Sequence, residues 1–382
     1  MFNGERGSRA DRFSAFRRSR LTGALGAFAV AVSLVSFQGA SAQAAGSGGS
    51  ANCQLPPGPL SVIELPAGSS VIDCDAVGRV VEDGGVGLTV PEPGYGVEVS
   101  AVSVSGPPEH FEIQVSDAGI ISYDLPSDGL TPAGGVDTPE PAPPVDEIPD
   151  TPPGTPDTPD GVADIPLPGA TPIPDTDSAA APGACSTSAF KSNGRKEYGT
   201  YKWYIGDGGM PAGLSRTDAK NAFADAINNI TDGYNNCNIV SLVGPNASYQ
   251  GTTTFEADIN NKSQCTARDK KSTWDAGDLH NDHAAVTCSW FKSQPPALAD
   301  VLEADVRYNT ADTKFTNNPT SGCSEKIDIR SVGTHEAGHL FGLGHVTGNA
   351  NVNQTMYWQS FWCSTAARTL ARGDMNGLNY IY

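Results

Sequence analysis

The chain has 382 residues and a net charge of −19 at pH 7, from 43 acidic and 24 basic side chains. No lysine or arginine lies between Arg79 and Lys191, whereas acidic residues are frequent there. Nucleic acids and anionic membranes both require a basic patch, so this charge pattern argues against them as partners. The length leaves room for more than one domain.

Residues 1–44 have the features of an export signal. Several arginines precede an apolar run from Leu21 to Phe37, and Ala42–Ala44 offers a cleavage site with small flanking residues. The run is short for a membrane span, and no later stretch is apolar enough to cross a bilayer. We therefore expect a secreted protein without membrane insertion. The pair Arg17-Arg18 leaves both the general and the twin-arginine export route open.

Residues 45–125 contain short runs in which apolar and polar residues alternate, such as Val97–Val104 and Phe111–Val115, separated by glycine and proline turns. This period of two predicts a small β-rich module. Residues 126–183 then consist mainly of proline, aspartate, threonine, glycine and alanine. Such a segment cannot bury enough apolar surface to fold, so we expect a disordered, acidic linker.

All eight cysteines follow the predicted signal. An even number of cysteines in an exported protein favours disulfides. Two lie in residues 45–125 and pair most simply with each other, whereas those in residues 184–382 allow many connectivities. Our first hypothesis pairs all of them in chain order: Cys53–Cys74, Cys185–Cys237, Cys265–Cys288 and Cys323–Cys363.

Residues 184–382 have the size of an ordinary domain. Ser215, with Asp218 three residues later, predicts a helix start, and apolar residues recur at helical spacing from Phe223 to Ile230. The order of elements predicts an α/β (α+β) fold with a twisted mixed sheet and three helices. The predicted strands are Tyr201–Ile205, Ile239–Val243, Thr252–Ala257, Ala284–Phe291 and Val301–Tyr308, and the later helices are Ser331–Leu343 and Ala366–Tyr380.

The stretch from His335 to His345 carries three of the six histidines. On a helix, His335 and His339 lie one turn apart on the same face and can bind one metal ion, for which zinc suits nitrogen ligands. Gly342 can end the helix in the left-handed conformation, so that the chain returns His345 as a third ligand. Glu336 would face the open fourth position as general base. The spacing predicts a catalytic zinc site.

This extended motif resembles that of the metzincins, and the order of elements is similar to their matrixin-like branch. The segment Gln354–Tyr357 looks like the Met-turn of that family. Val301–Asn309 is similar to the strand before its zinc helix, and Arg368–Tyr380 to its last helix. Two positions depart from the branch: Val346 stands where a small hydroxyl residue is usual, and Trp358 where a proline is expected.

The resemblance implies a zincin-like catalytic domain of the secreted bacterial matrixin type, that is, a zinc metalloendopeptidase. It implies His335, His339 and His345 as zinc ligands, Glu336 as base and Met356 beneath the metal. It also implies that a propeptide cysteine could cap the zinc. A disulfide between the only candidates for that role, the two cysteines of residues 45–125, would remove the free thiol.

A second metal site is a further hypothesis. Two carboxylates and two histidines follow one another in a polar stretch, and they could hold a structural calcium or a second zinc: Asp278, His280, Asp282 and His283. The same composition also occurs on plain surfaces. Likewise, the aromatic residues Trp358, Phe361 and Trp362 after the Met-turn could line a substrate pocket or belong to an ordinary core.

These features predict a monomeric secreted zinc endopeptidase that hydrolyses extracellular proteins, with its protein or peptide substrate extended along an edge strand at Ala284–Phe291. The rival from another class is a surface or matrix binding protein whose β-rich module does the binding, with a vestigial peptidase domain. The sequence leaves open whether the module inhibits, targets or binds substrate.

Overall fold

The computed structural model describes residues 53–105, 109–125, 184–280, 283–320 and 322–382, which lie within one unit, Ser50–Tyr382. The predicted export signal (1–44) and linker (126–183) lie outside the described residues. Within the described ranges, every helix is too short or too polar to cross a membrane.

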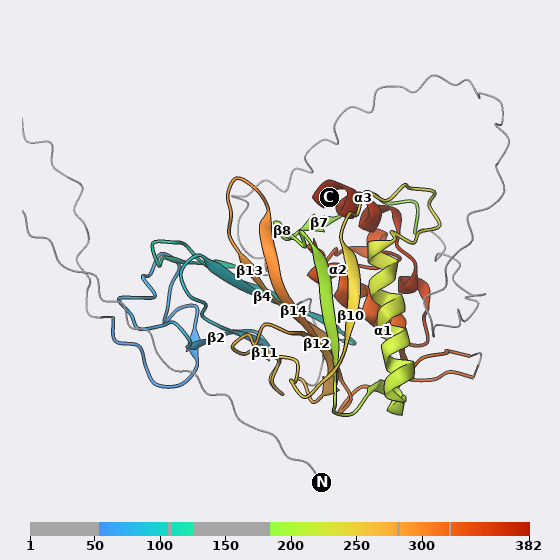
Figure 1. The fold of residues 1–382 in the computed structure, drawn as a ribbon, viewed down its shortest axis with the longest axis horizontal. Helices are drawn as coiled ribbons and strands as arrows, with labels where there is room; N and C mark the ends of the chain where they lie inside the picture. The colour runs from blue at the N-terminus through green and yellow to red at the C-terminus, as the bar shows by residue number, and fades with distance from the viewer. Residues whose placement is uncertain (1–52, 106–108, 126–183, 281–282, 321) are drawn as a thin grey trace, which may run out of the picture. The chain divides into compact units, whose positions relative to one another are not determined.

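A mixed sheet runs through the middle of the described residues (Figure 1). Its parallel strands lie in the order β10 (Asn246–Thr253), β9 (Thr200–Gly206), β12 (Ser272–Gly277) and β14 (Ala299–Asn309). Strand β13 (His283–Lys292) pairs antiparallel with β14. The predicted strands Tyr201–Ile205, Ala284–Phe291 and Val301–Tyr308 thus form, and they confirm a mixed α+β fold.

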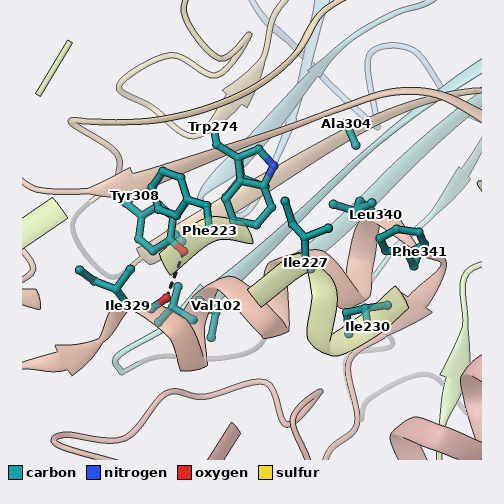
Figure 2. Close-up of a cluster of buried hydrophobic side chains, with 14 of the residues drawn as sticks. Val102, Phe223, Ile227, Ile230, Trp274, Ala304, Tyr308, Ile329, Leu340 and Phe341 are labelled. Carbon is teal, nitrogen blue, oxygen red and sulfur yellow. Dashed lines mark hydrogen bonds between the residues drawn. The ribbon is translucent and has the colours of Figure 1, made fainter. Parts of the chain in front are cut away.

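Three α-helices in the described part of the chain complete the fold: α1 (Arg216–Thr231), α2 (Ile329–Leu340) and α3 (Arg372–Ile381). The predicted cap is confirmed, because the Ser215 hydroxyl accepts a hydrogen bond from the Asp218 N–H at 3.2 Å. Helix α1 buries an apolar face against α2 and the sheet. Figure 2 shows Phe223 and Ile227 of α1 facing Trp274 of β12. This packing fixes the position of α2, the helix with the histidines.

Residues 53–125 form strands, as predicted, but these strands continue the same sheet. Strand β4 (Tyr95–Ser103) pairs antiparallel with β13, and β5 (Glu109–Val115) and β6 (Ile121–Asp124) follow outward. The edge of Ala284–Phe291 that was expected to be free is therefore occupied by β4. Unpaired backbone groups of an edge strand readily pair with another strand. The remaining strands β1 (Leu60–Ser61), β2 (Val80–Asp83) and β3 (Val86–Thr89) form a second sheet with β11 (Gln264–Cys265).

Short elements connect these parts. Strand β8 (Arg195–Lys196) pairs with β14, β7 (Lys191–Ser192) with β17 (Leu343–Gly344), and β15 (Phe315–Thr316) with β16 (Ile327–Asp328). Single turns of 3-10 helix occupy η1 (Pro211–Gly213), η2 (Asn349–Asn351) and η3 (Ala366–Arg368).

The prediction of a strand at Ile239–Val243 is wrong. The Asn235 side chain accepts hydrogen bonds from the N–H groups of Cys237 and Ile239, and Asn379 bonds the backbone of Val240 and Leu242. These side-chain amides provide the hydrogen-bond partners that the backbone of a strand would otherwise find in a neighbouring strand.

Two other boundaries also differ. The strand expected at Thr252–Ala257 lies earlier in the chain, as β10, and ends at Thr253. Beyond it the Ala257 N–H donates to the Asp275 carboxylate at 2.8 Å instead of to a neighbouring strand. The closing helix expected from Ala366 begins at Arg372, since the chain first extends to donate the Leu370 N–H to the Tyr234 carbonyl.

All eight cysteines lie in the described residues and are paired in chain order, as hypothesised: Cys53–Cys74, Cys185–Cys237, Cys265–Cys288 and Cys323–Cys363. Four disulfides are typical of proteins that fold in an oxidising environment. None of them joins residues 53–125 to the rest of the chain.

Candidate metal centre

Three histidine rings converge at one end of α2. The Nε2 atoms of His335, His339 and His345 lie 3.0–3.1 Å from one another; His335 and His339 are buried, and His345 is partly buried. The turn that returns His345 depends on Gly342, whose φ of +96° is the left-handed conformation that glycine tolerates. A side chain there would also collide with the Arg195 carbonyl.

The hydrogen bonds of the rings determine which nitrogen carries the proton. His335 donates from Nδ1 to the Thr355 carbonyl at 2.7 Å, and His339 from Nδ1 to the Leu343 carbonyl at 3.0 Å. Because a carbonyl only accepts, the Nε2 atoms of both rings present lone pairs to each other. Burial lowers the pKa of His335 to about 4 and the pKa values of the other two rings as well, so the rings are neutral.

Converging lone pairs repel one another unless a cation lies between them. A tetrahedral zinc ion would space its ligand nitrogens by about 3.3 Å, close to the observed separations. The residues present therefore fit a zinc ion: the Nε2 atoms of three neutral imidazoles meet at one point, and carbonyls hold the Nδ1 atoms of His335 and His339.

Glu336 lies beside the triad on the same helix. Its Oε2 accepts a hydrogen bond from the Thr287 hydroxyl of β13 at 2.5 Å, while its Oε1 is buried without a partner. Burial raises the pKa of Glu336 to about 8, against the lowering effects of the Thr287 hydroxyl and the Val102 N–H. This carboxyl group can thus exchange a proton near neutral pH. Sequence reasoning missed Thr287, because it comes from a distant strand.

Met356 is buried directly against α2. Its sulfur lies so close to Gly338 that a Cβ at this position would overlap it. The Thr355 and Met356 N–H groups both donate to the Asp374 carboxylate of α3, at 2.9 and 3.1 Å. Asp374 thereby anchors the segment that supplies the carbonyl for His335. Asp374 also caps α3, and an acidic residue in a first helical turn is a signal that could have identified it.

The matrixin family model (Peptidase_M10) matches residues 220–382. This part of the chain is matrixin-like. Matrixins are zinc-dependent peptidases, so the match supports a metalloprotease, and the histidine triad could hold its metal ion. None of the curated proteins compared with the chain matches it.

In this matrixin-like part, a pocket adjoins His335. Phe361 lines it, together with Tyr357 and Gln359. The other two aromatic candidates, Trp358 and Trp362, are not among its lining residues, and Trp362 is half exposed. The structure therefore brings one of the three predicted pocket residues to the site.

The residues of the hypothetical second metal site do not gather. His283 is buried and bonded through Nδ1 to Ser263 and through Nε2 to Glu109, at 2.7 and 2.9 Å. Asp282 lies outside the described residues, and His280 is exposed. Where the structure describes the chain, the groups of convergent metal-binding side chains include neither Asp278 nor these histidines. Calcium or a second zinc at this place stays a prediction.

Gly338→Ala is expected to destabilise the protein and weaken metal binding. Alanine normally stabilises a helix relative to glycine. Here its methyl group would displace the Met356 sulfur, and such overpacking costs about 1–3 kcal/mol. Urea unfolding and zinc titration measure both effects. Gly209→Ala is the control, because no atom lies within 4 Å of its added Cβ. Equal unfolding midpoints for the Gly338 variant and wild type would contradict the packing role of Met356.

Proposed function

We propose that the protein is a secreted zinc-dependent endopeptidase that hydrolyses peptide bonds in extracellular proteins. The observation that carries this proposal is the convergence of three imidazole Nε2 atoms beside a buried carboxyl group, Glu336. When bound by His335, His339 and His345, zinc supplies a Lewis acid that polarises a carbonyl and acidifies a water. The disulfides support an extracellular location.

Glu336 moves the proton in this proposal. Its unpartnered Oε1 would take the proton of the attacking water and then deliver it to the leaving nitrogen of the cut bond. The Thr287 hydroxyl holds the other oxygen and so orients the carboxylate. Asp374 and the Thr355 carbonyl keep His335 in the tautomer that binds metal.

The substrate in this proposal is an extended peptide. It would pair with β13, and the pocket lined by Phe361 beside His335 would receive the side chain next to the cut. The surface or matrix binding protein remains the rival from another class. The complete set of three ligands, base and base-orienting hydroxyl favours catalysis, because a vestigial domain would not need all of these groups in contact.

Zinc binding gives the first test. We expect wild-type protein to bind zinc at the triad, and His339→Ala to lose that site, because two imidazoles bind zinc far more weakly than three. Metal analysis after dialysis measures the stoichiometry. His280→Ala is the matched control and should keep the zinc bound at the triad. A lower zinc stoichiometry in this variant would reveal a second zinc site. Full zinc occupancy in His339→Ala would contradict the proposal.

A further inference from the structure

Strand β4 occupies the edge of β13 that an extended substrate needs. The two strands pair antiparallel, with Ala101 opposite Val286 and Ser100 opposite Thr287. Because β14 pairs with the other edge of β13, the backbone of β13 is engaged on both sides. A substrate can pair with this strand only after β4 leaves it.

The end of β4 also pairs with the segment that follows Met356. The Ser103 N–H donates to the Trp358 carbonyl at 3.5 Å, and the Ser360 N–H donates to the Ser103 carbonyl at 3.0 Å. Gln359 forms a parallel bridge with Ser103, and its side chain donates to the Val104 carbonyl at 3.0 Å. The strand therefore lies in a groove between β13 and Trp358–Ser360, bonded to both walls as an extended peptide would be.

In this groove β4 passes directly in front of the catalytic groups. The Val102 N–H is directed at the Glu336 carboxylate, and the Val102 side chain is 1% exposed. It belongs to the hydrophobic cluster that includes α2, where Figure 2 labels it. The Val102 N–H is thus a backbone group that β4 presents to Glu336.

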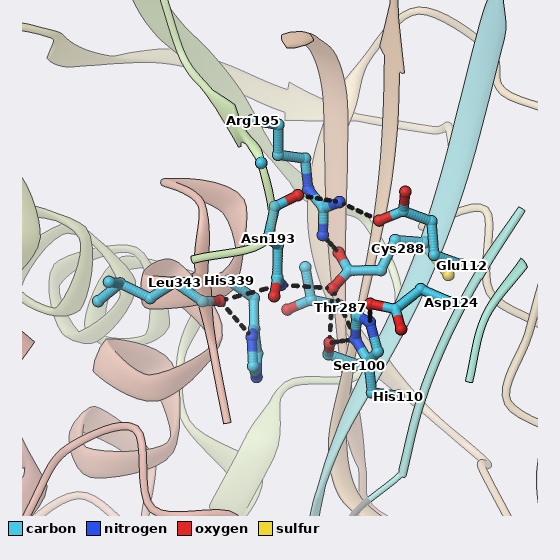
Figure 3. Close-up of polar contacts among 12 residues, drawn as sticks. Ser100, His110, Glu112, Asp124, Asn193, Arg195, Thr287, Cys288, His339 and Leu343 are labelled. Carbon is cyan, nitrogen blue, oxygen red and sulfur yellow. Dashed lines mark hydrogen bonds and ion pairs between the residues drawn. The ribbon is translucent and has the colours of Figure 1, made fainter. Parts of the chain in front are cut away.

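A buried ionic network holds β4 in place. Arg195 of β8 pairs with both Glu98 of β4 and Glu112 of β5, with 2.7 Å to Glu112. Figure 3 shows the Arg195 guanidinium bonded to Glu112. Asn193 donates to Glu98 at 2.8 Å and to the Leu343 carbonyl at 3.2 Å. That carbonyl also accepts from His339, so the network reaches the metal-binding triad.

A shared core adds to this attachment. Val97 and Val99 of β4 pack with Trp290 and with the Cys265–Cys288 disulfide of the matrixin-like part. Residues 53–125 are therefore docked through a backbone ladder, an ionic network and apolar packing together. The occupant of the groove is this chain's own segment, with complementary charge and matched register.

We propose that residues 53–125 are an intramolecular inhibitor whose strand β4 fills the substrate groove and keeps the peptidase latent. The inference rests on the proposed peptidase function and adds its regulation. Activation requires β4 to leave the groove. It needs no cysteine thiol, because Cys53 and Cys74, the candidates for capping the metal, are bonded to each other.

The test compares Ser103→Pro with Ser103→Ala in the full-length, zinc-loaded protein. Proline removes the N–H that donates to Trp358 and disturbs the pairing with β13, whereas alanine keeps every backbone bond. We expect Ser103→Pro to raise kcat/KM for a quenched fluorescent peptide by about tenfold or more, because activity follows the fraction of open molecules. Ser103→Ala should match wild type. Equal activity of wild type and a folded Ser103→Pro would overturn the inference.

A binding measurement separates failure of latency from failure of catalysis. In the Glu336→Gln background, a labelled peptide should bind to the Ser103→Pro variant and much more weakly to the protein with Ser103. Amide exchange of β13 should also be faster in the proline variant. If Ser103→Pro increased peptide binding but the variants that keep Glu336 cleaved no peptide, the occupied groove would be supported and the proposed peptidase activity refuted. Equal binding with and without Ser103→Pro would refute the occupied groove.

A second measurement covers the case in which Ser103→Pro does not fold. A site for a specific protease is inserted between residues 126 and 183 and then cut, which leaves no covalent link because no disulfide crosses the cut. In mild urea the released N-terminal piece should separate on size exclusion, and the remaining piece should gain activity over the uncut protein in the same buffer. Separation without any gain in activity would overturn the inference.

Discussion

Glu336→Gln is expected to lower kcat/KM for peptide hydrolysis by about 10²–10⁴-fold, the usual contribution of a positioned general base. Glutamine keeps the size of the side chain and can still bond Thr287, but it cannot accept the proton of the attacking water. The histidines are unchanged, so the metal should remain bound. The measurement is peptide cleavage in the Ser103→Pro background, with zinc content determined on the same samples.

Glu256→Gln is the matched control for this substitution. Glu256 is an exposed carboxylate that pairs with Arg307 and lies outside the triad, so its loss should leave both zinc and cleavage unchanged. If Glu336→Gln cleaved peptides at the rate of its parent, the base would have to be another group. If it lost zinc instead, the decrease in activity would say nothing about proton transfer.

Arg195→Met is expected to destabilise the protein by about 3–5 kcal/mol, the cost of removing one partner from a buried ion pair. The Arg195 side chain is fully buried, and the substitution removes the guanidinium that pairs with both Glu98 and Glu112. The free energy of unfolding in urea measures the loss. Lys191→Met is the control, because its pair with Asp124 is half exposed and such pairs contribute only about 0–1 kcal/mol.

The difference between Arg195→Met and wild type should shrink in acid. Burial by itself raises the pKa of Glu98, but Arg195 and His110 outweigh it and hold the pKa at about 2, below the ordinary 4.5. A carboxyl group whose folded pKa is depressed stabilises the fold above its unfolded pKa, and this contribution disappears as the pH falls through the folded value. If Arg195→Met destabilised the protein by the same amount at pH 4.5 and at about pH 2, the role of Glu98 would be contradicted.

The sequence was most informative where neighbours in the chain are also neighbours in space. His335 and His339 share a helix face because of the helical repeat, and Gly342 allows the tight return of His345. The Ser215 cap and the alternation in Val301–Tyr308 are equally local. Even the disulfides joined cysteines that follow one another in the chain. The convergence of the three histidines and the helix that carries two of them were therefore predictable.

Only the tertiary structure decided what surrounds these groups. Thr287 reaches Glu336 from β13, Asp374 supports Thr355 from α3, and no local pattern indicates either contact. The strand around Val97–Val104 was predictable from its alternation, but its partner strand was not. Any exposed strand edge can pair through its backbone, and the choice among edges depends on side chains that are far apart in the chain. The pairing of β4 with β13, reinforced by Arg195, turned an apparently separate module into the occupant of the groove beside the metal centre.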